Sequence, residues 1–275
     1  MVAYLDTNAF DNLYRRIGCT GADIANLRKA IYGRALSIRL SIHSLEEILL
    51  TRRASPQAFA AQIKLTLSIA NSRTLIKPCD QLVCDDIRAY RAHGAADRPF
   101  LRGEMQNAVT AGVAALIESD GEELEDEFVE ALEDARRGKD RFREMLARVT
   151  TIVGARVQTQ RPSFDQYWET YSARAAEALA DIAGPATIEP DRIDGLLTVK
   201  SVRITAGLAL SATYEAAFDP DYNVAEMAGF HHAVSAAAVA ETFVTGDPRL
   251  RAIVSRIPAD GFTVMSLPDF LKRAI

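Results

Sequence analysis

The opening residues constrain the fold more than any other stretch of the chain. A short apolar run at residues 2–5 ends abruptly in Asp6, Thr7 and Asn8. Such a run is typical of a parallel strand that is buried on both faces, and open α/β sheets bind their ligands at the carboxyl ends of these strands. The pattern therefore predicts that Asp6 lies at the ligand-binding edge of a sheet. The alternative is that Asp6 only caps the helix that Thr7 and Asn8 begin.

A second stretch, near the other end of the chain, has the same design. Residues 241–247 read Glu-Thr-Phe-Val-Thr-Gly-Asp, a short β-rich run with a hydroxyl group at Thr245 and an acid at Asp247. If the two runs are neighbouring parallel strands, their acids meet at one edge of the sheet. We therefore expect Asp6 and Asp247 to share a site.

Strand-like and helix-like segments alternate through both ends of the chain. This alternation predicts an α/β fold, with a central parallel sheet of about five strands in a three-layer α/β/α arrangement. No strand is followed by a G-x-G-x-x-G or Walker sequence, which argues against dinucleotide and nucleoside-triphosphate binding. The further strands are expected at 37–42, 73–78, 242–245 and 262–266, and the helices that accompany them at 24–35, 56–70, 224–240 and 250–256.

The middle of the chain is different, because residues 82–211 show helical periodicity and no strand alternation. We expect residues 85–199 to form an all-helical insertion that widens or covers the site, while residues 1–84 and 200–275 form a discontinuous α/β domain. Its helices are expected at 82–92, 104–117, 122–136, 140–150 and 164–182, with Gly121 and Gly138 as breaks, and a helix at 193–216 follows.

Composition limits the class of protein. A chain of 275 residues with 48% apolar and 25% charged residues is typical of a globular protein with a substantial core. No apolar run approaches the roughly 20 residues of a membrane span, and the three cysteines lack metal-ligand spacing. These features predict a cytoplasmic protein without a membrane partner. The net charge of −5 conceals ten acids and no base at residues 118–134, so the remainder of the chain is mildly basic, as an anionic substrate allows.

Glu47 is a second candidate acid, and two interpretations of it stay open. Ser44 followed by Glu47 matches a capping box, in which Glu47 has a purely structural role at the start of a helix. The same position, shortly after the strand expected at 37–42, also places the Glu47 carboxylate at the carboxyl edge of the sheet. It would then lie beside Asp6.

Four short motifs, taken together, resemble the PIN-domain nucleases. They are the opening Tyr4–Asn8, the helix start Ser44–Ile48, the His232–Ala233 step, and the run from Phe243 to Leu250. The resemblance covers about the first 84 and the last 75 residues and leaves the helical middle outside. It implies a central parallel sheet with an acidic pocket at its carboxyl edge and cleavage of RNA with Mg²⁺ or Mn²⁺. Many members of the family are toxins of bacterial toxin–antitoxin pairs.

The resemblance also implies roles for particular residues. Asp6, Glu47 and Asp247 match metal-binding acids of the family, with Glu46 a poorer match because it falls one position early. The supporting residues are Asn8, which matches an amide near the first acid, Thr245, which matches a hydroxyl partner of Asp247, and His232.

One acid of the family pattern is missing. The family usually has an aspartate two or three residues before the histidine–alanine step, where this chain has Gly229 or Phe230. Glu226, one helical turn earlier, is the fourth catalytic candidate, and Asp221 is a further one. The adjacent His231 and His232 are expected more often as surface or packing residues than as ligands.

These assignments lead to a functional hypothesis and an alternative. The hypothesis is a metal-dependent endoribonuclease, in which Asp6, Glu47, Glu226 and Asp247 surround Mg²⁺ or Mn²⁺ and activate water for attack on a phosphodiester. The alternative is a catalytically inactive PIN-like module that binds RNA or a protein. The candidate partners are RNA as substrate, an antitoxin protein, and a second copy of the chain in a homodimer.

Overall fold

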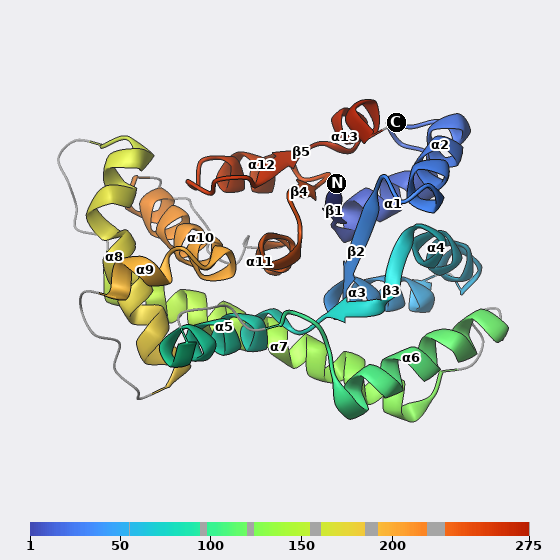
Figure 1. Cartoon of the computed structure of the whole chain (residues 1–275), viewed down its shortest axis with the longest axis horizontal. Helices are drawn as coiled ribbons and strands as arrows, with labels where there is room; N and C mark the ends of the chain where they lie inside the picture. Colours follow the sequence, from blue (N-terminus) through green and yellow to red (C-terminus); the bar gives the residue numbers. More distant parts are fainter. Residues whose placement is uncertain are drawn as a thin grey trace.

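The structure is a computed structural model, and it describes residues 1–54, 56–93, 98–119, 124–154, 161–184, 192–218 and 229–274. Strands and helices alternate at both ends of the chain, and a series of helices lies between (Figure 1). The strands are β1 Val2–Leu5, β2 Ser37–Ser41, β3 Ala70–Ile76, β4 Thr242–Val244 and β5 Thr263–Met265. The helices are α1 Thr7–Arg15, α2 Gly21–Tyr32, α3 Ile42–Ala54, α4 Pro56–Ile69, α5 Cys79–His93, α6 Gly103–Glu118, α7 Asp126–Val153, α8 Phe164–Ala183, α9 Ile193–Leu196, α10 Lys200–Phe218, α11 Phe230–Val239, α12 Pro248–Ser255 and α13 Leu267–Ala274.

The five strands form one parallel sheet in the order β3-β2-β1-β4-β5. The chain builds outward from β1 to β3, and it later returns to the other side of β1 to add β4 and β5. The strand order therefore reverses between β1 and β4, and ligands of open α/β sheets bind at such a switch point, beyond the carboxyl ends of the strands. The predicted α/β class and the five-stranded parallel sheet are confirmed.

Successive side chains of each strand point to opposite faces of the sheet. Both faces carry buried apolar side chains, and helices cover both. Ala3 and Leu5 of β1 pack into a core with α1, α2, α3, α4, α6 and α13. Tyr4, between them, packs into a second core with α5, α8, α10, α11 and α12. β4 alternates in the same way, with Phe243 in the second core and Val244 in the first.

Helix α7 is shared by the two cores. Its first half buries Phe128 and Leu132 in the first core, and its second half buries Phe142 and Leu146 in the second. Figure 1 shows α7 running along one side of the molecule, from α6 toward α8. The expected break at Gly138 is wrong, because α7 continues through it.

Gly138 has a packing role instead of a breaking one. A Cβ atom at this position would lie 2.6 Å from the Asp80 carboxylate and 2.9 Å from the Pro78 ring, at the start of α5. The absence of a side chain therefore allows α7 to approach α5 closely, and burial there outweighs the roughly 1 kcal/mol by which glycine disfavours a helix interior.

Three other boundaries differ from those expected. β3 covers residues 70–76 instead of 73–78. The helix expected at 193–216 is divided into α9 and α10, because the N–H groups of residues 197–199 bond to carbonyls three residues back, as in a tight turn. Of the helix expected at 224–240, α11 covers residues 230–239, while residues 219–228 lie outside the described part of the chain.

Helices on both sides of the predicted boundary at residue 85 contribute to one core. α5, α8 and α10 all bury residues beside Tyr4 and Phe243 of the sheet. The division into an α/β domain and a helical insertion at 85–199 stays a prediction. Among the described helices, none is long and apolar enough to cross a membrane.

Candidate metal site at the sheet edge

Asp6 follows β1 directly and is almost fully buried, with 2% of its surface exposed. One carboxylate oxygen accepts a hydrogen bond of 2.7 Å from the Ala9 N–H, so Asp6 caps α1. The carboxylate also accepts bonds from the Thr245 hydroxyl and the Gly246 N–H beyond β4. Burial raises the pKa of Asp6, and its interactions with His232 and Thr245 only partly offset this effect. Asp6 therefore has both a capping role and the position at the sheet edge that the sequence predicted.

Asp247 caps the next helix along the same edge. Its Oδ1 accepts hydrogen bonds from the N–H groups of Arg249 and Leu250, at 2.8 and 3.1 Å. Its own N–H donates to the Thr245 hydroxyl oxygen, 3.1 Å away. Because this hydroxyl also bonds to Asp6, Thr245 joins the two aspartates at the switch point between β1 and β4.

Glu47 lies on α3, and the predicted capping box is wrong. The helix begins at Ile42, two residues before Ser44, and the Ser44 N–H donates to the Ser41 hydroxyl at 3.2 Å. Glu47 is therefore beyond the first turn and does not cap the helix. Its side chain is 24% exposed and is directed away from the backbone of its own helix.

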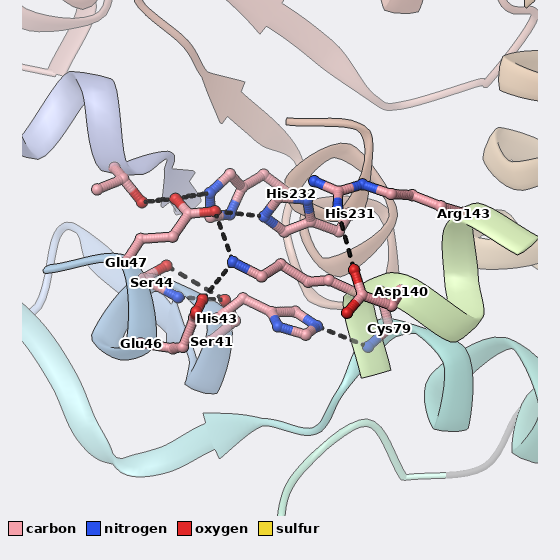
Figure 2. Close-up of polar contacts among 12 residues, drawn as sticks. Ser41, His43, Ser44, Glu46, Glu47, Cys79, Asp140, Arg143, His231 and His232 are labelled. Carbon is pink, nitrogen blue, oxygen red and sulfur yellow. Dashed lines mark hydrogen bonds and ion pairs between the residues drawn. The ribbon is translucent and has the colours of Figure 1, made fainter. Parts of the chain in front are cut away.

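Side chains from α11, α1 and α7 contact the Glu47 carboxylate. His231 Nε2 lies 2.9 Å from Oε1, and His232 Nε2 lies 2.9 Å from Oε2. The Thr7 hydroxyl, at the start of α1, donates to Oε2 at 2.6 Å. Figure 2 shows Glu47 from α3 meeting both histidines from α11. We call Glu47, His231 and His232 the His–Glu triad.

Helix α11 presents both histidines in its first turn. Gly229, the residue before the helix, has a φ of 84°, a left-handed conformation that glycine adopts without strain. A Cβ atom there would also lie 2.9 Å from Leu250. Both histidine rings are buried, with 6% and 3% of the residue surface exposed, and their centroids are 4.2 Å apart. The expectation that they are surface or packing residues does not describe these polar contacts.

Tyr4 fixes the orientation of the His232 ring from the opposite side. Its hydroxyl lies 2.7 Å from His232 Nδ1, 2.7 Å from the Ser41 hydroxyl and 3.1 Å from that of Ser44. Burial raises the pKa of Tyr4, so this hydroxyl keeps its proton. Each nitrogen of the His232 ring therefore has a defined partner.

The electrostatics of the triad favour a charged carboxylate beside a neutral ring. Burial by itself would raise the pKa of Glu47, but the interaction with His232 and the hydrogen bonds of both histidines hold that pKa far below its usual range. Burial and the adjacent His232 lower the pKa of His231 to about 3, although Glu47 acts in the opposite direction. At pH 7 Glu47 is therefore an anion and His231 is neutral.

Lys139 of α7 brings a positive charge to this cluster. Its ammonium group donates to Glu46 Oε2 and lies 3.3 Å from Glu47 Oε1. The Lys139 and Glu46 side chains are only 10% and 6% exposed, so they form a buried ion pair. Glu46, which the family pattern matched poorly, thus contributes to the cluster through Lys139.

The structure brings together most of the predicted site residues that it describes. Asp6 and Asp247 share Thr245, and Thr7, next to Asp6, bonds to Glu47. Asn8 is exposed beside Gly246. Glu226 and Asp221 lie outside the described residues.

Sequence reasoning missed the contributions of Tyr4, Thr7 and Lys139 to the site. Tyr4 looked like one apolar residue of a buried strand, and Lys139 lay in a segment outside every motif.

The chain matches no protein-family model, no curated protein and no solved structure in three comparisons with known proteins.

Proposed function

We propose that this chain is a metal-dependent ribonuclease with a PIN-like fold, acting at the carboxyl edge of the sheet. One observation carries the proposal: Thr7, adjacent to Asp6, bonds to Glu47, so acids from β1 and α3 converge beside the switch point. The order of the motifs along the chain, which resembles that of PIN-domain nucleases, adds the substrate class.

The residues at this edge suit a divalent cation. Glu47 is anionic, partly exposed and faced by two imidazole nitrogens, and the three ligand atoms all lie within 4.8 Å of one another. A bound divalent ion would lower the pKa of a water molecule and stabilise charge on the leaving oxygen of a phosphodiester. Thr7 and Thr245 orient the carboxylates of Glu47 and Asp6 through hydrogen bonds. Asp247 and Glu226 remain candidates for further acidic groups of this site.

A specific observation favours the inactive module as the second candidate. Lys139 already neutralises Glu46 and lies beside Glu47. A cation built into the protein reduces the need for a metal ion at the same carboxylates. In this alternative the edge is a structural cluster, and the protein binds RNA or a protein partner without cleaving it.

The test is cleavage of a mixed-sequence RNA in Mn²⁺ or Mg²⁺ by wild type, Asp6→Asn and Glu47→Gln. We expect both variants to lose about 100-fold or more in rate, as when one transition-state contact is removed. Asp165→Asn, at an exposed acid on α8, is the matched control for loss of one charge.

Equal rates in wild type and in the two site variants would contradict the proposal. RNA binding by wild type without cleavage in either metal would support the inactive module. Asp247→Asn then tells whether Asp247 contributes to cleavage, provided that its helix remains folded by circular dichroism.

A further inference from the structure

We propose that the His–Glu triad binds one first-row transition-metal ion of the Zn²⁺ type, in preference to Mg²⁺. This inference deepens the proposed function by naming the cation, but metal binding at the triad does not require that the protein cleave RNA. It also departs from the all-carboxylate Mg²⁺ or Mn²⁺ set of Asp6, Glu47 and Asp247 that the sequence suggested.

The spacing of the donor atoms is the first argument. Each histidine Nε2 lies 2.9 Å from a different oxygen of the Glu47 carboxylate. Two ligands that are each about 2.1 Å from a tetrahedral ion are about 3.4 Å apart, so each of these two contacts needs to open by about half an ångström. One ligand atom from each of the three residues can be chosen so that all lie within 4.8 Å of one another. Rotation of the Glu47 side chain would provide this movement, at the expense of its contacts with Thr7 and Lys139.

The support around the triad is the second argument. Histidine ligands of metals usually bond through the other ring nitrogen to a group that fixes the ring. His232 has this arrangement, with Nε2 facing Glu47 and Nδ1 2.7 Å from the Tyr4 hydroxyl. With a metal on Nε2, the ring N–H is at Nδ1 and donates a hydrogen bond to the Tyr4 oxygen. The Tyr4 hydroxyl then donates a hydrogen bond to the Ser41 hydroxyl oxygen, which lies 2.7 Å away.

The chemistry of the donors selects the ion. Mg²⁺ prefers oxygen ligands in octahedral geometry, whereas imidazole nitrogen suits Zn²⁺ and its first-row neighbours. Two histidines and one glutamate leave a fourth position of a tetrahedral ion open, as in hydrolytic zinc sites. The 24% exposure of the Glu47 side chain gives that position access from solvent.

Lys139 sets the affinity of the triad. Its ammonium group is 3.3 Å from Glu47 Oε1 and therefore opposes a divalent cation at the same carboxylate. The buried pair with Glu46 holds the ammonium group when an ion arrives. We therefore expect removal of the Lys139 charge to strengthen metal binding.

The test is calorimetry of the full chain, stripped with EDTA, against Zn²⁺ and against Mg²⁺. We expect one Zn²⁺ per chain and far weaker binding of Mg²⁺. Zn²⁺ binding should weaken by about 100-fold or more in each of His231→Ala, His232→Ala and the conservative Glu47→Gln. Mutation of a group that only hydrogen-bonds to a metal ligand already costs about 10- to 100-fold in metal affinity. Lys139→Met should strengthen binding by about tenfold.

Controls separate the triad from the other acids. Asp165→Asn on α8 should bind Zn²⁺ as wild type does, and Asp247→Asn tests the carboxylate set that the sequence suggested. Absorption by Co²⁺ in place of Zn²⁺ should show nitrogen ligation that both histidine variants reduce, and circular dichroism checks their folding. Absence of Zn²⁺ binding, or Zn²⁺ binding that folded triad variants retain, would overturn the inference. RNA cleavage in Mg²⁺ by the two histidine variants, with loss of cleavage in Glu47→Gln, would uphold the proposed function and reject the triad as its metal site.

Discussion

Two groups of polar side chains occupy the same edge of the sheet, and they use their atoms differently. The aspartate pair, Asp6 and Asp247, gives carboxylate oxygens to backbone N–H groups at the starts of α1 and α12. The His–Glu triad directs its polar atoms at one another, across elements that are far apart in the chain. The first arrangement stabilises local structure, while the second gathers donors that a ligand could share.

The comparison shows that an acid at a strand end is weak evidence for a metal ligand by itself. Both aspartates have complete structural explanations as caps, whereas Glu47 has none within α3. The groups that surround a carboxylate separate the two roles better than its position does. The three predictions below test this distinction.

The largest expected change in stability is at Lys139. Lys139→Met leaves the buried Glu46 carboxylate without its counter-charge, and breaking a buried ion pair on one side costs about 3 kcal/mol or more. We expect this loss in the free energy of unfolding measured by urea denaturation in EDTA. Zn²⁺ should recover more stability in this variant than in wild type. An unchanged free energy in EDTA would mean that Lys139 and Glu46 do not form a buried pair.

The free energy of unfolding should fall as the pH falls because the His231 ring stays neutral in the folded protein. The unfolded histidine has a pKa near 6.5 and the folded one about 3, so the unfolded state binds the extra proton as the pH falls. Over pH 7 to 5 this effect removes about 2 kcal/mol from the free energy of unfolding.

His231→Gln in EDTA should therefore lose less stability over that range than wild type does. The ring faces His232, Glu47, Lys139 and His43, and these groups remain in both proteins. Identical slopes in wild type and variant would show that His231 titrates normally in the folded state.

The smallest effect is expected in the aspartate pair. Asp247→Ala removes the side-chain acceptor for two N–H groups at the start of α12 and should cost about 1 kcal/mol in the free energy of unfolding. The affinity for Zn²⁺ should stay the same if the triad alone binds the ion. A large loss of Zn²⁺ affinity would instead show that Asp247 helps to bind the ion.

The sequence predicted the sheet because its strands carry strong local signals. The runs around Tyr4 and Phe243 are apolar, short and followed by turn or cap residues, so their burial and direction follow from pattern alone. Glycine was a less reliable guide, since Gly138 looked like a helix break and lies inside α7. Close packing against Pro78 is a tertiary effect that local propensity does not contain.

The candidate site was predicted only in part. Asp6 and Glu47 were found because they follow strands at the expected edge. The role of His231 was underestimated, since adjacent histidines at a helix start carry no signal of what they face. Lys139 was missed because its contact with Glu46 joins residues 93 positions apart. Such contacts depend on how α7 packs against α3.

The continuity of α7 has a mechanical consequence for this edge. The first half of α7 packs in one core and the second half in the other, and Lys139 lies close to the middle of the helix. Its ammonium group cannot withdraw from Glu47 by a hinge within the helix, and the pair with Glu46 holds the side chain, so the charge stays beside Glu47 when an ion binds. A methyl group at Gly138 would clash with Asp80 and Pro78 at the start of α5, so α7 and α5 would have to move apart at the residue that precedes Lys139.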